Sequence, residues 1–259
     1  MPTDRFIHRL VLPLVFPAGL APGAGKESGN RLALAMDGRD RPILRGTALA
    51  GCLRSSLTAL GDTVLERWFG RALTGADDAV GDHTSPLRVA DLVLDTGLVI
   101  DTGKSRTALR HHNQIDRHTG AVRDGGLFTL DALPPGSAGA AVLHLHLADD
   151  AMDAQAIGFL ADLVAVAGDA LILGGHAARG IGLARLAGPA LHQRWDLRDE
   201  AQHAAWLDAS WAWRGQAGWT PAGAALPASA RSTTVLQVTA RLVVSPGQDL
   251  CIAEGTGAD

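Results

Sequence analysis

A chain of 259 residues, 47% of them hydrophobic, is long enough to bury a substantial core and is not composed like a disordered polymer. Its two cysteines, Cys52 and Cys251, are too few for a disulfide scaffold or a paired CxxC metal site, and the net charge of −4 argues against a uniformly basic nucleic-acid binder. No run supplies about 20 apolar residues for a membrane span, and Pro13 and Pro17 break the only candidate signal peptide, so we expect a cytoplasmic protein.

The start of the chain predicts a strand and then a short hairpin. Phe6–Phe16 is rich in β-forming residues and precedes the Gly- and Pro-rich segment Ala18–Asn30, which indicates a strand followed by a loop. Leu32–Met36 and Pro42–Leu44 flank an Asp37-Gly38 pair, which is a signal for a tight turn.

The apolar spacing then changes from a strand period to a helix period. Thr47 is a suitable N-cap for a helix that runs to Leu60 and ends at Gly61. The segment of residues 62–95 continues helically, passes through a polar Gly- and Asp-rich connection and ends in the strand-like run Leu87–Leu94. We interpret residues 62–95 as an insertion in the fold.

Residues 97–126 are poor in apolar side chains and rich in basic ones. We expect a long hairpin or loop that projects from the core, because loops of this length are usually functional or disordered. The strip could neutralise several phosphates, although charge alone fits a solvated loop about equally well. Its cations and histidines are Lys104, Arg106, Arg110, His111, His112, Arg117, His118 and Arg123.

The second half of the chain resumes regular periodicity. Strands are predicted at Leu127–Leu133 and Ala140–Leu147, an amphipathic helix at Asp153–Ala167, and short strands at Leu171–Leu173 and Leu183–Leu186. The order strand, helix, strand, strand, helix, strand is that of the ferredoxin-like (RRM-type) split βαββαβ unit, so we predict an α+β fold.

The C-terminal part is predicted to lie outside this unit. Five of the six tryptophans fall in Pro189–Gly223, which we interpret as a packed appendage, with base stacking as the alternative. We therefore divide the chain into a domain at residues 1–188, a Trp-rich appendage and linker at 189–232, and a segment at 233–259. The last segment echoes the first strand and loop, and so is either the start of a second domain or a terminal strand.

Two glycine-rich segments have the composition of turns that approach a phosphate backbone. PILRGTALAGCLRS (residues 42–55) places a glycine and a small hydroxyl residue where a strand leads into a helix, and free amides at a helix start favour phosphate. GGHAARGIG (174–182) adds a second such loop with the cation Arg179. We reject a dinucleotide fingerprint for it, because the loop follows a helix instead of opening one. Plain capping of the helix after Arg45 is the alternative for the first segment.

A third segment, RHHNQIDRHTGAVRDGG (110–126), places Ile115 among polar residues before a turn at Thr119-Gly120. An apolar tip flanked by arginines is suited to wedge between stacked bases while holding phosphates. A surface loop with a locally packed isoleucine is the alternative.

These segments, taken in order, resemble the Cas-seven-like backbone subunits of type III CRISPR effector complexes, which are members of the RAMP superfamily. RGTALAGCLRSSL resembles the family's glycine-containing helix motif, and SPLRVADLVL resembles its lid strand. IDRHTGAV with LFTLDALPPGS resembles the thumb hairpin and its returning strand, and LGGHAARGIGLARL resembles the terminal glycine-rich loop. Together they cover Phe6 to Leu186.

The resemblance implies a subunit that stacks with other effector subunits in a helical filament along a guide RNA, whose thumbs kink the guide so that it can pair with a target RNA. It implies a lid at about residues 62–95 and a thumb at about 97–126. Recognition would be tolerant of sequence, since backbone contacts position without reading bases. The residues that would contact RNA are Arg45, Gly46, Thr47, Arg54, Arg106, Arg110, Asn113, Ile115, Arg117, Gly174, Gly175 and Arg179.

Some members of this family cut the target RNA with an aspartate between the first strand and the first helix. The corresponding position here falls near Asn30 or Arg31, which cannot act as the carboxylate, and Glu27 and Asp37 are only weak candidates. We therefore predict that this domain binds guide RNA without cleaving and holds no cofactor, with a divalent metal needed only if ribonuclease activity is present.

Two other functions stay open. One is a RAMP endoribonuclease that cleaves target RNA or processes guide precursors, with a histidine as general acid or base. Its candidates are His8, His111, His112 and His176. A metal site at His111-His112 is disfavoured, because adjacent side chains of a strand point to opposite faces. The other is a binding module unrelated to CRISPR.

Overall fold

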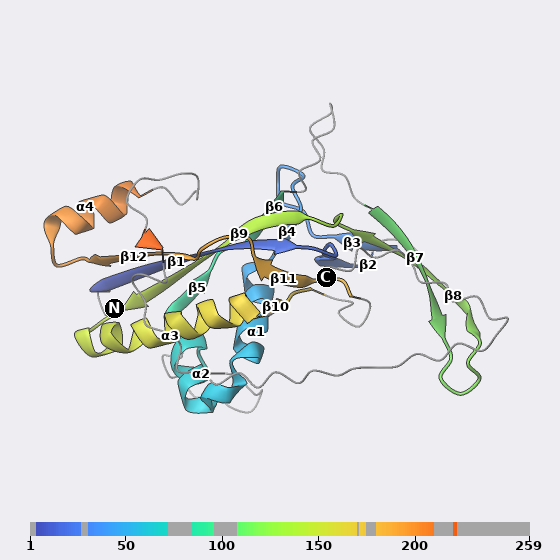
Figure 1. Ribbon diagram of the computed structural model, residues 1–259, viewed down its shortest axis with the longest axis horizontal. Helices are drawn as coiled ribbons and strands as arrows, with labels where there is room; N and C mark the ends of the chain where they lie inside the picture. The colour runs from blue at the N-terminus through green and yellow to red at the C-terminus, as the bar shows by residue number, and fades with distance from the viewer. Residues whose placement is uncertain are drawn as a thin grey trace.

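One large sheet forms the body of the molecule, and a smaller sheet extends from its end (Figure 1). The computed structural model describes residues 4–26, 31–71, 84–95, 108–169, 171–174, 180–209 and 220–221. Nine strands form the large sheet, whose main path is β10-β11-β1-β9-β6-β4. These strands are β1 (Phe6–Phe16), β4 (Ile43–Leu44), β5 (Leu87–Val89), β6 (Leu92–Asp95), β9 (Ser137–Leu147), β10 (Leu171–Ile172), β11 (Leu183–Leu186), β12 (Leu191–Asp196) and β13 (Thr220–Pro221).

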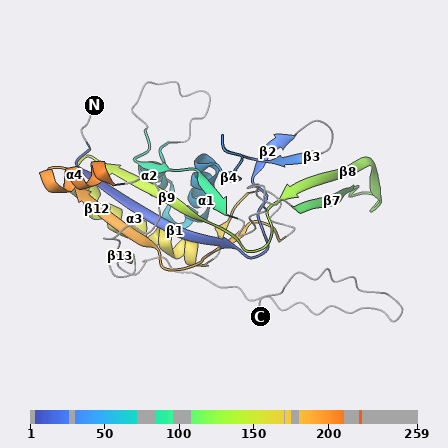
Figure 2. The same ribbon diagram turned by 90° about the horizontal axis from the view of Figure 1, so that it is seen from above.

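Three helices lie on one face of this sheet (Figures 1 and 2). The helices in the described residues are α1 (Gly46–Ser56), the short 3-10 helix η1 (Thr58–Leu60), α2 (Asp62–Phe69), α3 (Asp150–Asp169) and α4 (Glu200–Asp208). α1, α2 and α3 pack their apolar faces against alternate residues of β1 and β9, which together form the main hydrophobic core. α4 follows β12 at the far end of the sheet.

The topology confirms the predicted ferredoxin-like α+β fold. α1 lies between β1 and β6 in the sequence, and in the sheet these two strands are separated by β9. In the same way, α3 lies between β9 and β11 in the sequence, and these two strands are separated by β1. Each helix therefore links two strands that are separated by a third, which is the split arrangement. All pairs among these four strands are antiparallel.

β1 is the central strand of the body and is buried on both faces over most of its length. Along one edge it pairs with β9 from Phe6 to Phe16, and along the other it changes partner. β12 pairs with Phe6 to Val11, and β11 pairs with Leu14 and Val15. Pro13, which has no N–H to donate, lies where β12 ends and β11 begins, so it is accommodated inside a central strand.

The second sheet has the order β2-β3-β8-β7 and ends in a projecting hairpin. Its strands are β2 (Gly23–Lys26), β3 (Arg31–Leu34), β7 (Ala108–Ile115) and β8 (Val122–Ala132). The segment Ala18–Asn30, predicted as a loop, therefore contributes a strand, because the backbone of β2 pairs with β3 despite its glycines. The predicted hairpin around Asp37 is confirmed by the Met36–Pro42 bridge.

Two predicted segments contribute to the body of the fold. Within residues 62–95, β5 and β6 pair with β9, and Leu65, Trp68 and Leu92 belong to the main core. The boundary at residue 188 does not end the sheet, because β12 pairs with β1 along six residues. The predicted helix to Leu60 is also divided, into α1 and η1. The segment 233–259 lies outside the described residues.

α3 is the one helix, among the described residues, long and apolar enough by length and composition to cross a membrane. The same composition suits a core helix, and α3 buries Phe159, Leu163 and Val166 in the main core. Its first turn carries Asp150 and Asp153, and the Asp149 carboxylate accepts a hydrogen bond from the Met152 amide, which satisfies one of the amides at the start of the helix.

Candidate nucleic-acid interface

The hairpin formed by β7 and β8 (Ala108–Ala132) projects beyond the end of the large sheet (Figures 1 and 2). At its turn, Asp116 Oδ1 accepts hydrogen bonds from the backbone amides of His118 and Thr119, at 2.8 and 3.0 Å. These amides hold the pKa of the Asp116 carboxyl below its usual value. Gly120 closes the turn with a φ of 68°. The tight turn predicted at Thr119-Gly120 is confirmed.

A large bulge divides the hairpin into a stem and a tip. In the stem, Asn113 pairs with Leu127, and in the tip Ile115 pairs with Val122. The bulge (Arg123–Gly126) therefore opposes the single residue Gln114. Gly125 has a φ of 66°, and a Cβ on Gly126 would lie 2.7 Å from the Arg123 carbonyl oxygen, so this bend requires glycines.

The tip exposes apolar and cationic side chains together. Ile115 and Val122 are 53% and 56% exposed, which is high for large apolar residues. Among the described residues, no hydrogen bond or ion pair engages the side chains of Arg110, Arg117 or Arg123. These guanidinium groups therefore stay available to an external anion.

Alternation along the stem separates two of the predicted contact residues. Arg110 pairs with Leu130 and His112 with Phe128, so these four side chains share one face. Asn113 pairs with Leu127 on the opposite face of the stem. Arg110 and Asn113, both predicted to contact RNA, thus point to opposite sides.

The first backbone amide of α1 is hydrogen-bonded to a carboxylate from the connection between β5 and β6. Asp91 Oδ1 accepts a hydrogen bond from the Gly46 amide at 2.7 Å, and Arg45 is the N-cap residue without a capping side chain. The predicted capping by Thr47 is therefore wrong, and the Gly46 amide is not free for a phosphate. Arg45 and Thr47 are both exposed.

Gly46 itself is explained by packing. A Cβ at this position would lie 2.1 Å from the carbonyl oxygen of Val89, because the backbone of β5 passes directly against the start of α1. Arg54, at the other end of α1, donates a hydrogen bond from Nη1 to the Gly70 carbonyl at 2.6 Å. Nearby, the Ser85 hydroxyl donates a hydrogen bond to the Trp68 carbonyl. Arg54 thus joins α1 to the end of α2.

The glycine-rich loop at residues 174–182 joins α1 to the base of the hairpin. Burial raises the pKa of the Cys52 thiol on α1, and a hydrogen bond with the Gly174 amide opposes this shift. At the other end of the loop, Ile181 is buried in a small cluster with Ala21, Leu130 and Ala132.

The two ends of this loop are tied together. The Leu173 amide donates to the Gly182 carbonyl at 2.8 Å, and a Cβ on Gly182 would lie 2.1 Å from the Leu173 carbonyl oxygen. The absence of a side chain at Gly182 is therefore required by the chain's own backbone at Leu173. Gly175, His176 and Arg179 lie outside the described residues, as does Arg106 in the segment before the hairpin.

Asp37, a weak catalytic candidate, is held in its own turn. Its Oδ1 accepts from the amides of Arg39 and Arg41, and its Oδ2 accepts from the Arg41 side chain. The Arg41 amide, with smaller contributions from the Arg41 side chain and the Arg39 amide, lowers the pKa of Asp37 to about 2. Glu27, the other candidate, lies outside the described residues.

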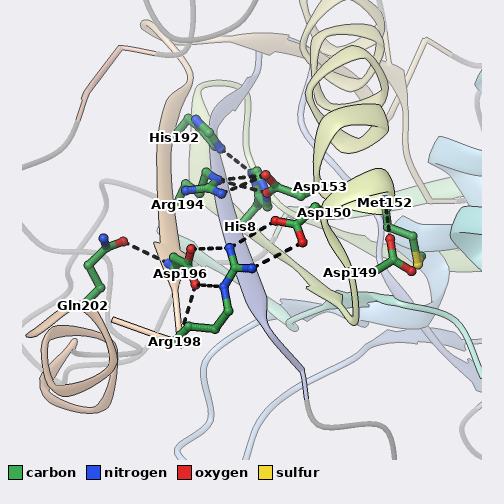
Figure 3. A network of polar contacts seen from close by, with 10 residues as sticks. All are labelled: His8, Asp149, Asp150, Met152, Asp153, His192, Arg194, Asp196, Arg198 and Gln202. Atoms are coloured by element: carbon green, nitrogen blue, oxygen red, sulfur yellow. Dashed lines mark hydrogen bonds and ion pairs between the residues drawn. The ribbon is translucent and has the colours of Figure 1, made fainter. Parts of the chain in front are cut away.

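A buried polar network connects β12, β1 and α3 on the helix-covered face (Figure 3). His8 Nε2 lies 2.7 Å from Asp153 Oδ1, and His8 Nδ1 lies 3.0 Å from His192 Nε2. A neutral His8 that donates from Nε2 to Asp153 must accept at Nδ1, so His192 donates from Nε2. Burial lowers the pKa of both histidines, that of His192 to about 4.

The same network continues to the surface through arginines of β12 and the turn after it. Arg194 binds both oxygens of the Asp153 carboxylate, and Arg198 bridges Asp196 and Asp150 (Figure 3). The Arg194 and His8 contacts lower the pKa of the Asp153 carboxyl and outweigh its partial burial. The network therefore fastens β12 to α3.

The opposite face of the same strands carries a second buried polar group. Arg9 Nε donates to His144 Nε2 at 3.0 Å, and the Arg9 guanidinium lies over the Trp195 ring. Burial, together with the Arg9 charge, lowers the pKa of His144 to about 4. Across the part of the chain that the structure describes, no cluster of three or more His, Cys, Asp or Glu side chains could hold a metal ion.

Comparisons with known proteins give a consistent picture. A family model described as the RAMP superfamily matches residues 13–185. Among the 194 chains of solved structures that match is one from the cryo-EM structure of the Type III-B Cmr-beta bound to cognate target RNA. It has 14% sequence identity and a TM-score of 0.54, over 71% of this chain and 98% of that one. No curated protein matches.

Proposed function

Because this chain belongs to the RAMP superfamily, we propose that it is a guide-RNA-binding backbone subunit of a type III CRISPR effector complex. The hairpin is the observation that carries the proposal. It extends from the body, exposes the apolar pair Ile115 and Val122 at its tip, and surrounds that pair with arginines that have no partner among the described residues. Such a surface suits a wedge between bases that also holds phosphates.

The family similarity supports the partners as well. The structural neighbour is a chain of an assembly bound to target RNA, so guide RNA, target RNA and other effector subunits are the partners that we propose, in a filament and in the cytoplasm. We also propose that the residues predicted from the resemblance contact the guide, with Arg117 foremost, and that Arg110 and Asn113 do so from opposite faces of the stem. The Gly46 amide is the least suited of these, because the Asp91 carboxylate already occupies it.

This domain is proposed to bind without cleaving. Asp37 is engaged by two amides and a guanidinium, so its carboxylate is committed to a turn. A histidine-dependent endoribonuclease, the alternative, finds less support in the geometry. His8 is fully buried, and His111 and His112 point to opposite faces of β7.

The deciding experiment is to purify the native complex and sequence its RNA. We expect a population of short RNAs that share one repeat-derived segment and differ elsewhere. Random fragments of cellular RNA, or none, would overturn the proposal. Target cutting is then measured with the wild-type chain and with Glu27→Ala and Asp37→Ala. Loss of cutting in either variant would overturn the non-cleaving assignment.

A further inference from the structure

One unit of the chain lies outside the main hydrophobic core. In chain order the buried residues of this core end at Ala190, directly before β12. In residues 191–208, which comprise β12, the following turn and α4 and are all described, Trp195 is the one buried hydrophobic residue, and it belongs to neither cluster. No residue of α4 is buried. Apolar packing therefore contributes little to the attachment of residues 191–208, which we call the strap.

Backbone pairing and polar side chains attach the strap to the body. β12 pairs with β1 from Phe6 to Val11. Arg194 binds both oxygens of the Asp153 carboxylate on α3 (Figure 3). The guanidinium carbons of Arg194 and Arg198 lie over the Phe6 ring, 4.7 and 4.6 Å from its centroid, and this ring is fully buried. Charged groups of the strap thus cover an apolar side chain of the central strand.

A pair of buried histidines lies at the centre of these contacts. His8 of β1 and His192 of β12 face each other through ring nitrogens 3.0 Å apart, and the other ring nitrogen of His8 lies 2.7 Å from Asp153. The carboxylate can only accept, so His8 donates to it, and just one of the two facing nitrogens can carry a hydrogen. The pair can therefore take up one proton beyond its neutral state but not two, because a second would set two N–H groups against each other.

The charges around the pair favour neutral rings. The groups that face it from the elements packed against it are Asp150 and Asp153 of α3, Arg194 and Asp196 of β12, Arg198 of the next turn, and the uncharged Leu145 of β9 and Thr220 of β13. Two imidazolium ions would add two positive charges beside a carboxylate that an arginine already neutralises. Burial lowers the pKa of both rings, that of His192 to about 4. Detachment returns the rings to water, where a histidine titrates at about 6.5, so proton uptake favours the detached strap below that pH.

We infer that the strap is a detachable element and that the His8–His192 pair is its acid-sensitive latch: uptake of a second proton by the pair frees β12 from β1 while the main core stays folded. The strap detaches from residue 191 onward, because Ala190 is held in the core and the Ala187 amide donates to the Pro13 carbonyl. β13 moves with it, since β12 is its one partner among the described strands. Detachment uncovers one edge of the central strand. The inference is independent of the proposed RNA-binding function.

Amide hydrogen exchange of the full chain, followed by mass spectrometry at pH 7.5 and 5.5, measures the opening of each strand. The protection of β12, corrected for the intrinsic effect of pH on exchange, is compared with that of β9, which pairs with the other edge of β1. β12 should be less protected than β9 at both pH values, because sub-global opening needs less free energy than global unfolding. On acidification β12 should lose a further factor of roughly 10 to 100, about ten for each histidine. Equal protection of the two strands at both pH values, or no acid-dependent loss in β12, would overturn the inference.

Two arginine substitutions test the polar attachment. Arg194→Gln removes the two-point contact with Asp153 and should lower the protection of β12 roughly tenfold at both pH values. Arg185→Gln removes an exposed arginine of the neighbouring strand β11 and is the matched control, so it should leave the protection of β12 unchanged. An equal effect of the two substitutions would contradict a specific polar attachment.

Two histidine substitutions test the latch itself. His192→Gln replaces a titrating ring with an amide that can donate or accept, so a protonated His8 no longer meets a second N–H group. The acid-dependent loss of β12 protection should therefore shrink roughly tenfold. His203→Gln removes an exposed histidine of α4 and should retain the full loss. A wild-type acid response in His192→Gln would show that the pair is not the latch. The comparison of β12 with β9 in the wild type decides on detachment even where a variant does not fold.

Discussion

Asp91 accepts a hydrogen bond from the Gly46 amide across 2.7 Å, which places a carboxylate from the β5–β6 connection at the positive end of α1. The bond does the work of a capping side chain, although the acceptor comes from a distant part of the chain. It also means that an RNA phosphate and Asp91 are competitors for one amide.

Asp91→Ala should lower the free energy of unfolding by about 1 kcal/mol, because it leaves an amide at the start of α1 without its acceptor. Thermal melts should shift down by roughly 2–4 °C for a chain of this size. Asp91→Asn keeps an acceptor oxygen and serves as the control. If Asp91→Ala also bound RNA more tightly with a steeper dependence on salt, the start of α1 would be a latent phosphate site.

Gly46→Ala should destabilise the protein by roughly 1–3 kcal/mol, since the added methyl group would meet the rigid backbone of β5 at Val89. Gly51→Ala, on the exposed side of the same helix with nothing within 4 Å of the added Cβ, is the matched control. That variant should be neutral or slightly stabilising, because alanine favours a helix. Denaturant unfolding of both proteins measures the difference, and equal midpoints would contradict the packing role of Gly46.

The buried histidines should make stability depend on pH. Burial lowers the pKa of His8, His144 and His192, so the folded state binds protons less readily than the unfolded chain, whose histidines titrate near 6.5. Their contribution is therefore fully present above about pH 6.5 and declines as the pH falls toward 4, by on the order of 1 kcal/mol per pH unit for each titrating group.

Unfolding measured between pH 7.5 and 5 tests this dependence. His192→Gln removes one titrating ring and retains hydrogen-bonding capacity, so its stability should fall less steeply with acid than that of the wild type. Parallel curves for the two proteins would show that His192 is not one of the groups responsible.

Arg117→Ala and Arg123→Ala should each weaken RNA binding about equally for all sequences. If each side chain neutralises one phosphate, the slope of log affinity against log salt should decrease by about 0.7 for a single strand. Fluorescence titrations over a range of salt concentrations measure the slope. Arg41→Ala removes an arginine that already pairs with Asp37, and should leave the slope unchanged.

Sequence patterns predicted the elements whose signals are local. α3 is long and apolar at a helical period, and the turn after Ile115 carries its own Asp and Gly, so both were found close to their observed places. β12 was missed because the side chains on its helix-facing side, which are His192, Arg194 and Asp196, are all polar. His192 is buried among His8 and Asp153, so the strand shows no apolar alternation that a single sequence could reveal.

The candidate interface was also predicted only where its signals are local in the sequence. Arg110, Ile115 and Arg117 are marked by their own neighbours in the sequence, and the structure brings them to one hairpin. The hydrogen bond between Asp91 and Gly46 joins residues 45 positions apart and depends on how β5 packs against α1. No local sequence pattern could therefore predict it. The Gly125-Gly126 pair is a local sequence signal for the bulge, but the residue that the bulge opposes, Gln114, is determined only by the register of β7 and β8.

The hairpin base is joined to the body by a backbone bridge between Leu20 and Leu133, whose side chains belong to the main core, and by a separate small cluster of four buried residues. The body, in contrast, is interlocked by leucines, phenylalanines and a tryptophan from three helices and the large sheet. Because fewer buried apolar side chains hold the hairpin than hold the body, its backbone amides should exchange with solvent at a lower opening free energy, and amide hydrogen exchange of the two sheets measures the difference.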